Sequence, residues 1–201
     1  MKLDLNYPPL KHVDALESQA NHSMVLYDKE EYRRLVQNRF IENGLNKGEN
    51  SFYLTFRDPK LVEHDLMEYG IDVDLFKKRN LLHIFQINND METHEEIKIN
   101  LEHLFENLTA DLKPPFRFTG RIVPDVSTVE GIKSELMYEH LFHSNFDKYR
   151  CSFLCAYPIE TIEKTNRSEW LRHLLENHHN LIYATNPENS VTFDTDLLRS
   201  A

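Results

Sequence analysis

The residue types best suited to chemistry lie at the ends of predicted strands. Arginine follows two of these strands, at Arg57 and Arg121, and tyrosine ends two others, at Tyr27 and Tyr157. Ligands of open α/β sheets bind outside the carboxyl ends of the strands, near the point where strand order reverses. We therefore hypothesise a pocket in which the arginines orient a polar group and the tyrosines offer apolar ring faces with a polar tip. The candidate ligand-binding residues are His22, Tyr27, Arg57, Asn89, Arg121 and Tyr157.

Each of these residues also has a structural interpretation. Tyr27 and Tyr157 could be core residues whose hydroxyl groups find local partners, and Arg57 and Arg121 could be solvated or ion-paired surface groups. His22 precedes the first predicted strand and could be a hydrogen-bonded structural histidine rather than a ligand or a base. The sequence leaves both interpretations open.

No self-sufficient catalytic or metal-binding pattern accompanies these residues. The chain has no Gly-x-Ser-x-Gly elbow and no His-Glu-x-x-His pair. His140 and His143 lie at helical spacing, and His178 and His179 lie near a predicted helix end, where we expect solvated side chains. We predict no catalytic residue, no cofactor and no metal site.

The two cysteines, Cys151 and Cys155, lie four residues apart on one predicted strand. A strand rises about 3.3 Å per residue, so both thiols face the same side of the sheet about 13 Å apart. Bridged Cα atoms lie within roughly 7 Å of each other, which excludes a disulfide between this pair. We expect buried apolar thiols, with a reactive Cys155 as the alternative.

Strands and helices alternate along most of the chain, as in α/β proteins. Near-continuous apolar segments such as LLHIFQI and CSFLCAY are typical of parallel strands that are covered on both faces. We predict a mainly parallel sheet between two layers of helices, with an antiparallel edge at the last short strands. The predicted strands span residues 23–27, 52–56, 81–87, 116–119, 151–157, 181–184 and 191–193.

Helix starts are predicted from capping residues. Asp28 with Glu31 has the spacing of a capping box, and Asp58 followed by Pro59 suits the cap and first-turn positions. An extended arm containing two prolines is expected before a short helix over residues 13–19. Further caps are predicted at Thr93, Ser127 and Asn166, and the helix after Ser127 is expected to bury Val129, Ile132, Leu136, Met137 and Leu141.

Length and charge limit the class of protein. The chain has 201 residues, 40% of them hydrophobic, which suffices for one core, so we predict an N-terminal arm over residues 1–20 and a single domain over residues 21–201. The net charge of -10 opposes nonspecific binding to nucleic acid or to an anionic membrane. No apolar run approaches the ~18 residues that span a bilayer, and the N-terminus lacks a secretory signal, so we expect a cytoplasmic protein.

Residues 40–87 resemble part of the RecA-like ATPases of the circadian-clock KaiC family. A helix runs into a Gly-Leu-x-x-Gly-Glu turn at residues 44–49, followed by a strand, a helix that begins with proline, and Gly-Ile-Asp at residues 70–72. In that family the first strand enters a glycine-rich phosphate loop ending in Gly-Lys-Thr or Gly-Lys-Ser. Here it enters Tyr-Asp-Lys-Glu-Glu at residues 27–31, which lacks the glycines that let backbone amides approach a phosphate and adds negative charge. We expect no ATP hydrolysis at this position.

Residues 22–184 resemble the MEDS domain, a sensory domain named for methanogen and methylotroph proteins and the dichloromethane-dehalogenase repressor. The resemblance implies an α/β, three-layer RecA/KaiC-like (P-loop NTPase-like) sandwich that has lost its nucleotide loop and binds a small molecule. The chain departs from the family at Arg121, Ala156 and Pro158, so the identity of the ligand does not follow. The matching positions are His22, Tyr27, Gly44-Leu45, Gly48-Glu49, Tyr53, Gly70-Ile71-Asp72, Gly120 and Leu154-Cys155-x-Tyr157.

The predicted function is that of a non-catalytic sensory or signal-transduction domain of prokaryotic type, with a small-molecule ligand at the carboxyl ends of the strands. Such domains are usually attached to a DNA-binding or kinase module, so the output is expected through a separate regulator or kinase partner or through self-association as a homo-oligomer. No direct contact with nucleic acid or membrane is expected. The alternatives are a degenerate nucleotide-binding, ATPase-like enzyme and a pure protein-interaction subunit.

Overall fold

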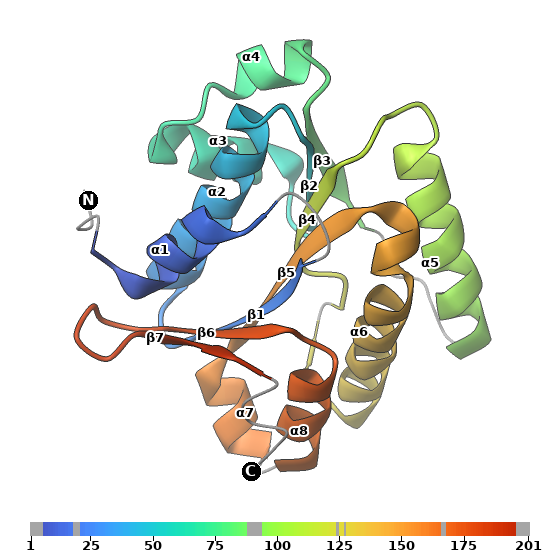
Figure 1. Ribbon diagram of the computed structural model, residues 1–201. Helices are drawn as coiled ribbons and strands as arrows, with labels where there is room; N and C mark the ends of the chain where they lie inside the picture. The colour runs from blue at the N-terminus through green and yellow to red at the C-terminus, as the bar shows by residue number, and fades with distance from the viewer. Residues whose placement is uncertain are drawn as a thin grey trace.

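The computed structural model describes residues 6–17, 21–87, 94–123, 125–126, 128–165 and 168–195, with the backbone alone for residues 94–101, 145–149 and 164–165. Seven strands form one sheet in the order β3-β2-β4-β5-β1-β6-β7 (Figure 1). Every neighbouring pair is parallel except β6 and β7, which confirms the mainly parallel sheet with an antiparallel edge. The strands are β1 (Asn21–Tyr27), β2 (Asn50–Thr55), β3 (Leu82–Gln86), β4 (Phe116–Gly120), β5 (Cys151–Pro158), β6 (Asn180–Ala184) and β7 (Val191–Asp194).

Helices cover both faces of the sheet, as predicted. The first four helices lie on one face, α5, α6 and α8 lie on the other, and α7 follows the end of β5 (Figure 1). Within the described residues, none of these helices has the length and apolar character required to cross a bilayer. The helices are α1 (Pro8–Ala15), α2 (Glu30–Asn46), α3 (Pro59–Tyr69), α4 (Val73–Lys78), α5 (His94–Thr109), α6 (Val129–Tyr149), α7 (Ile159–Thr165) and α8 (Ser168–Glu176).

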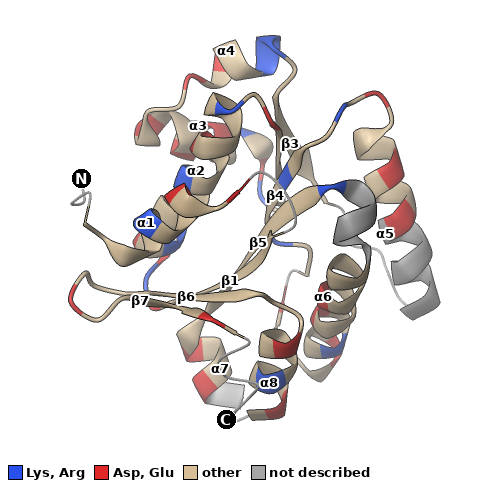
Figure 2. Ribbon diagram, in the orientation of Figure 1, with Lys and Arg blue, Asp and Glu red and all other residues tan. Residues whose placement is uncertain are grey.

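The central strands are apolar on both faces because each face packs against helices. On β5, Phe153 and Tyr157 belong to the core beneath α5 and α6, whereas Leu154 and Ala156 belong to the core beneath α1 and α2. This assignment follows from the period of two along a strand. Charges lie mainly on the helices and loops (Figure 2), and Arg117 is the one Lys, Arg, Asp or Glu within strands β1 to β6.

The predicted helix start at Asp58 is confirmed in detail. The Asp58 carboxylate accepts a hydrogen bond of 2.9 Å from the Lys60 amide, and Pro59 is the first residue of α3. Asp72 caps α4 in the same way, through a 2.9 Å bond from the Leu75 amide. These side chains satisfy backbone amides that the first turn of a helix leaves without partners.

The first two helices begin at other residues than expected. The predicted helix over residues 13–19 is wrong, because α1 already begins at Pro8, where a missing amide hydrogen costs nothing. The predicted cap at Asp28 is also wrong. A capping residue must directly precede the first helical one, and α2 begins at Glu30, so Lys29 occupies the cap position and makes no side-chain cap bond.

Two further differences concern the second half of the chain. The short helix α7 was not predicted, and Val129, expected to be buried, is 41% exposed at the first position of α6. Val129 is the first residue of the helix, and the helical period alone cannot show that this end is exposed. The predicted caps Thr93, Ser127 and Asn166 lie outside the described residues. At the start of α6, the Thr128 hydroxyl accepts a hydrogen bond of 3.0 Å from the Gly131 amide.

A buried ion pair connects α2, β2 and β4. Arg117, which is 0% exposed, donates a short hydrogen bond to Glu49 and another of 3.3 Å to the Phe40 carbonyl. Its guanidinium also lies over the Phe40 ring, 4.8 Å from the centroid. Gly44 leaves room for this side chain, since a Cβ atom there would lie 2.5 Å from Arg117 Cδ. The Gly-Leu-x-x-Gly-Glu turn therefore serves the folding of this chain, because its first glycine makes room for Arg117 and its glutamate pairs with it.

We expect the substitution Arg117→Met to lower the free energy of unfolding by about 3–5 kcal/mol, because it leaves Glu49 buried without its partner. The double substitution Arg117→Met with Glu49→Leu should recover most of that loss. Urea unfolding followed by circular dichroism measures both values. The exposed Arg172, paired with Glu176 at 2.7 Å, is the matched control, and Arg172→Met should change stability by less than about 1 kcal/mol. A double variant as unstable as the single one would contradict this explanation.

Gly120 ends β4 with φ of 126°, and a Cβ atom there would lie 1.9 Å from the Leu54 carbonyl oxygen. We expect Gly120→Ala to destabilise the protein by more than about 1 kcal/mol, because both the backbone conformation and the contact oppose a side chain. Gly48→Ala is the control: its φ is 76°, but no atom lies within 4 Å of the added carbon. Equal losses in the two variants, measured by thermal unfolding, would show that the collision is unimportant.

Candidate functional site

A pocket of about 300 Å³ lies at the carboxyl ends of β1, β2, β4 and β5, with Tyr27, Arg57, Gly120, Arg121 and Ala156 among its lining residues. The connections of the neighbouring strands β2 and β4 diverge here. β2 continues into α3 on one face, and β4 continues into α6 on the other (Figure 1). Such a divergence creates the crevice in which open α/β sheets bind ligands. We call this cavity the strand-end pocket.

One wall of the strand-end pocket is a hydrogen-bonded network. Arg33 donates to Glu30 at 2.7 Å and to the Tyr53 hydroxyl at 3.1 Å, and it also bonds Gln37. Tyr27 donates to the other Glu30 oxygen at 2.9 Å. Partial burial would raise the pKa of Glu30, but the Arg33 guanidinium outweighs it and holds that pKa below its usual range. Burial together with the Glu30 charge raises the pKa of Tyr27 to about 12.

Two further arginines line the strand-end pocket. Arg57 has a side chain that is 52% exposed and lies 3.5 Å from Asp65. Arg121 makes no ion pair with any residue that the structure describes, and it is close enough to Glu30 to lower the pKa of that carboxyl. These two groups therefore give the pocket a positive side that its wall does not neutralise.

The bend at residues 27–31 carries acidic groups where a phosphate loop would offer amides. Glu30 and Glu31 occupy the first turn of α2, and Glu30 lines the strand-end pocket. Although Asp28 does not cap the helix, a carboxylate therefore still lies at the helix N-terminus, the position that binds phosphate in nucleotide-binding loops.

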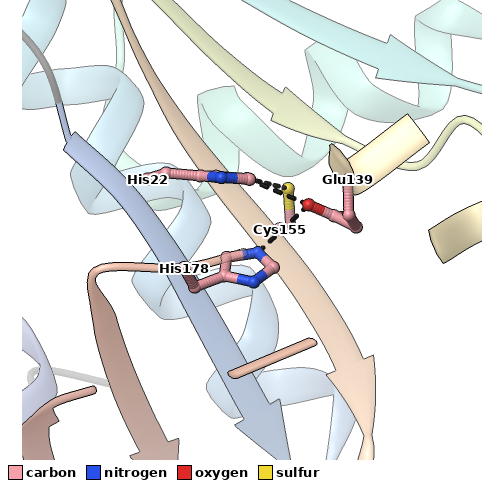
Figure 3. Close-up of side chains that lie close together, drawn as sticks. All are labelled: His22, Glu139, Cys155 and His178. Carbon is pink, nitrogen blue, oxygen red and sulfur yellow. Dashed lines mark hydrogen bonds and ion pairs between the residues drawn. The ribbon is translucent and has the colours of Figure 1, made fainter. Parts of the chain in front are cut away.

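A second polar group is buried on the other side of the sheet, beneath α6. His22 from β1, Cys155 from β5, Glu139 from α6 and His178 from the turn before β6 point toward one another (Figure 3). Glu139 Oε2 lies 3.0 Å from His22 Nε2 and 3.2 Å from His178 Nε2, and Cys155 Sγ lies 3.5 Å from His22 Nε2. The four nearest ligand atoms all lie within 4.8 Å of one another. We call these four residues the buried centre.

The electrostatics of the buried centre follow from its burial. Burial and the neighbouring His178 lower the pKa of His22 to about 4, so His22 is neutral near pH 7. Burial alone would raise the pKa of Glu139, but His178 and His22 outweigh it and hold that pKa well below its usual range. Burial raises the pKa of the Cys155 thiol, and the Glu139 charge raises it further. A reactive thiol, the alternative that the sequence left open, would require the opposite shift.

Tyr157 connects the buried centre to the rim of the sheet. Its hydroxyl donates a short hydrogen bond to Glu139 Oε1 and lies 2.9 Å from Glu135 Oε1. Burial, with the charge of Glu139, raises the pKa of Glu135 to about 8, so Glu135 is mostly protonated near pH 7. In that state Glu135 donates to Tyr157, which in turn donates to Glu139.

The six residues predicted from the sequence are thus divided between two places. Tyr27, Arg57 and Arg121 line the strand-end pocket together. His22 and Tyr157 lie beneath α6 on the opposite face of the sheet, so the expectation that Tyr157 lines the same pocket is wrong. The side chains of β5 alternate between the faces, and Ala156 occupies the pocket side instead. Asn89 lies outside the described residues.

Several residues of both places were missed. Glu135 and Glu139 are four apart on α6, with Ile132 and Phe142 buried at the same helical period, and this spacing was the available signal. His178 was expected to be solvated, which is wrong: it is 0% exposed, because the turn before β6 passes beneath α6. Arg33 and Gln37 reach the strand-end pocket from α2, and only the register of α2 on the sheet shows this.

Comparison with known proteins places this geometry in a family. The model of the MEDS domain (MEthanogen/methylotroph, DcmR Sensory domain) matches residues 21–189. A KaiC-like protein from the hyperthermophilic archaeon Pyrococcus horikoshii OT3 is similar in structure, with a TM-score of 0.61 and 11% identity over 83% of this chain and 73% of that chain. A second protein of that organism, known from a structural study, has a TM-score of 0.61 and 12% identity over 92% of this chain and 91% of its own.

At this level of identity the two solved structures show the fold alone, which is KaiC-like. No curated protein matches the chain. The family model covers most of the chain, from the first residue of β1 to the turn before β7. The chain therefore belongs to the MEDS domain family, whose members are sensory domains.

Proposed function

We propose that this MEDS domain binds a small molecule bearing an anionic or strongly polar group in the strand-end pocket and acts as a sensor without catalytic turnover. The observation that carries the proposal is the pair Arg57 and Arg121, which face a cavity of about 300 Å³ with no carboxylate bonded to Arg121 among the described residues. A cavity of this size at the carboxyl ends of parallel strands is the usual place and scale for a small ligand.

The hydrogen-bonded wall of the strand-end pocket supports binding because its side chains are already held in place. Arg33, Glu30, Tyr27, Tyr53 and Gln37 bond to one another, so a ligand would not have to immobilise them. Binding to such a preformed wall avoids part of the entropy cost of association. The positive charge of Arg33 is balanced by Glu30, which leaves Arg57 and Arg121 to select for a negative group.

The lining of the strand-end pocket also supports the absence of turnover. Among the residues that the structure describes, this lining contains no cysteine, histidine or serine that could act as a nucleophile or general base. Its carboxylate, Glu30, has a lowered pKa and is held by Arg33 and Tyr27, which makes it a poor proton acceptor near neutral pH. The output, through a separate partner or through self-association, is part of the proposal and rests on the sensory role of the family.

Native mass spectrometry of the full chain purified from its own host tests the ligand. We expect a mass increment that disappears on denaturation and that exceeds the mass of any single metal ion. Arg57→Ala and Arg121→Ala should each weaken retention about 10-fold or more, because each removes charge-assisted hydrogen bonds to the ligand. Their circular dichroism spectra should match that of the wild type.

Arg34 provides the matched control for Arg57. It lies 3.3 Å from the same Asp65 carboxylate but does not line the strand-end pocket, so Arg34→Ala should leave retention unchanged. A wild-type chain without any increment would contradict the proposal. Full retention in both pocket variants would remove these arginines from the site.

A turnover assay with ATP and Mg²⁺ separates the sensor from a degenerate ATPase. We expect no hydrolysis above the buffer blank and no shift in melting temperature, because Glu30 and Glu31 place negative charge at the helix N-terminus that would meet the phosphates. Hydrolysis that disappears in an Arg57→Ala, Arg121→Ala double variant would refute the non-catalytic assignment.

A further inference from the structure

The buried centre joins four separate segments of the chain through side chains that are rarely buried together. His22 is 0% exposed, Glu139 1% and His178 0%, and Cys155 completes the group (Figure 3). We propose that His22, Glu139, Cys155 and His178 form a tetrahedral binding site for one divalent transition-metal ion of the zinc type. This proposal does not depend on the strand-end pocket or its ligand.

Three of the six ligand-to-ligand distances within the buried centre match the edges of a coordination tetrahedron. Metal bonds of about 2.0–2.3 Å place the ligand atoms of tetrahedral zinc about 3.3–3.6 Å apart. The three observed separations are 3.0 Å and 3.2 Å from Glu139 Oε2 to the two imidazole Nε2 atoms, and 3.5 Å from Cys155 Sγ to His22 Nε2. The other three lie within 4.8 Å, so an ion fits after side-chain shifts of up to about 1 Å.

Two contacts outside the buried centre orient its side chains as metal sites require. His178 Nδ1 lies 2.6 Å from the Leu174 carbonyl oxygen, so Nδ1 carries the proton of the neutral ring and the lone pair of Nε2 points toward Glu139. Tyr157 donates to Glu139 Oε1, which turns Oε2 toward the histidines. Metal-binding histidines and carboxylates are typically held by such partners.

In the neutral ring, the lone pair of His178 would face an anionic oxygen 3.2 Å away, an unfavourable arrangement. A cation between the two atoms converts this contact into two coordination bonds.

Charge and donor type indicate the class of ion. A carboxylate and a thiolate contribute two negative charges, which a divalent ion cancels, so the occupied centre carries no net charge in a dry interior. Two imidazole nitrogens and one sulfur favour zinc and its first-row neighbours over Mg²⁺ or Ca²⁺, which prefer oxygen ligands. Four protein ligands complete the tetrahedron, as in structural rather than catalytic zinc sites.

A small cavity adjoins the buried centre. It has a volume of about 30 Å³, and its lining includes Glu139 and Cys155 as well as Gly120 and Arg121, which lie at the carboxyl end of β4. A thiol must lose its proton to coordinate the ion, so we expect binding to release a proton to solvent.

Cobalt substitution of the full chain tests the proposal. The purified protein is dialysed against a chelator, confirmed as folded by circular dichroism, and titrated with Co²⁺. We expect one equivalent to bind, with the strong visible absorption of tetrahedral cobalt and a near-ultraviolet charge-transfer band from thiolate to metal. One equivalent of Zn²⁺ should displace the cobalt and remove both absorption features, whereas excess Mg²⁺ should not. Zinc should also raise the melting temperature of the metal-free protein.

Variants assign the ligands. Cys155→Ser should abolish the charge-transfer band, and Glu139→Gln and His178→Ala should each weaken cobalt binding about 100-fold or more. Cys151→Ser is the matched control, because Cys151 is a buried thiol on the same strand and the same face but outside the cluster; its spectrum should equal that of the wild type.

Folded wild-type chain that shows no tetrahedral cobalt spectrum would overturn the proposal and leave the buried centre as a metal-free hydrogen-bonded group. This outcome is decisive even if the ligand variants fail to fold, because it needs the wild type alone. A charge-transfer band that survives in Cys155→Ser, or disappears in Cys151→Ser, would overturn the ligand assignment.

Discussion

An ionised carboxylate in a dry protein interior must be neutralised, and Glu139 is such a group. Its partners come from three distant segments: His22 from β1, Tyr157 from β5 and His178 from the turn before β6. Removing one partner from a buried charged pair typically costs about 3–5 kcal/mol. The carboxylate therefore helps to hold α6 at one position over the sheet.

The same requirement operates on the other face, where Arg117 and Glu49 neutralise each other between α2 and the sheet. The positions that this chain shares with the MEDS family serve different purposes: some maintain the fold, and others belong to the buried centre or to the strand-end pocket. Gly44 and Glu49 accommodate and pair Arg117, and Gly120 lets β4 pass the Leu54 carbonyl. These are requirements of folding. His22 and Cys155 belong to the buried centre, whereas Tyr27 and Tyr53 line the strand-end pocket.

Most of the fold could be predicted because its signals are local. Apolar runs indicated the strands, and Asp58 indicated a helix start that depends on a single capping hydrogen bond. The cap predicted at Asp28 failed because the start of α2 is set by packing, with Tyr32 and Val36 buried against the sheet, rather than by capping. Propensity at a helix end is worth about 1 kcal/mol, which burial of two side chains exceeds.

The candidate site was predictable only in part, for a geometric reason. The strand-end rule brought Tyr27, Arg57 and Arg121 together, because parallel strands end at one edge whatever their order. It could not show which face each side chain takes, since one residue of register moves a side chain to the other face. Tyr157 was misplaced for this reason. His178 lies in a turn, where no periodicity indicates burial.

Arg121 is the residue at which the two polar regions meet. It lines the strand-end pocket and also the small cavity that reaches Glu139, and its charge lowers the pKa of Glu30 on one side and that of Glu135 on the other. An anion bound by Arg121 would weaken the second of these effects, because its own charge opposes that of the guanidinium. Glu135 would then hold its proton more firmly, and through Tyr157 the hydrogen bond to Glu139 would change. An anion in the strand-end pocket would thus act by electrostatics on the group beneath α6, on the other face of the sheet, without a large movement.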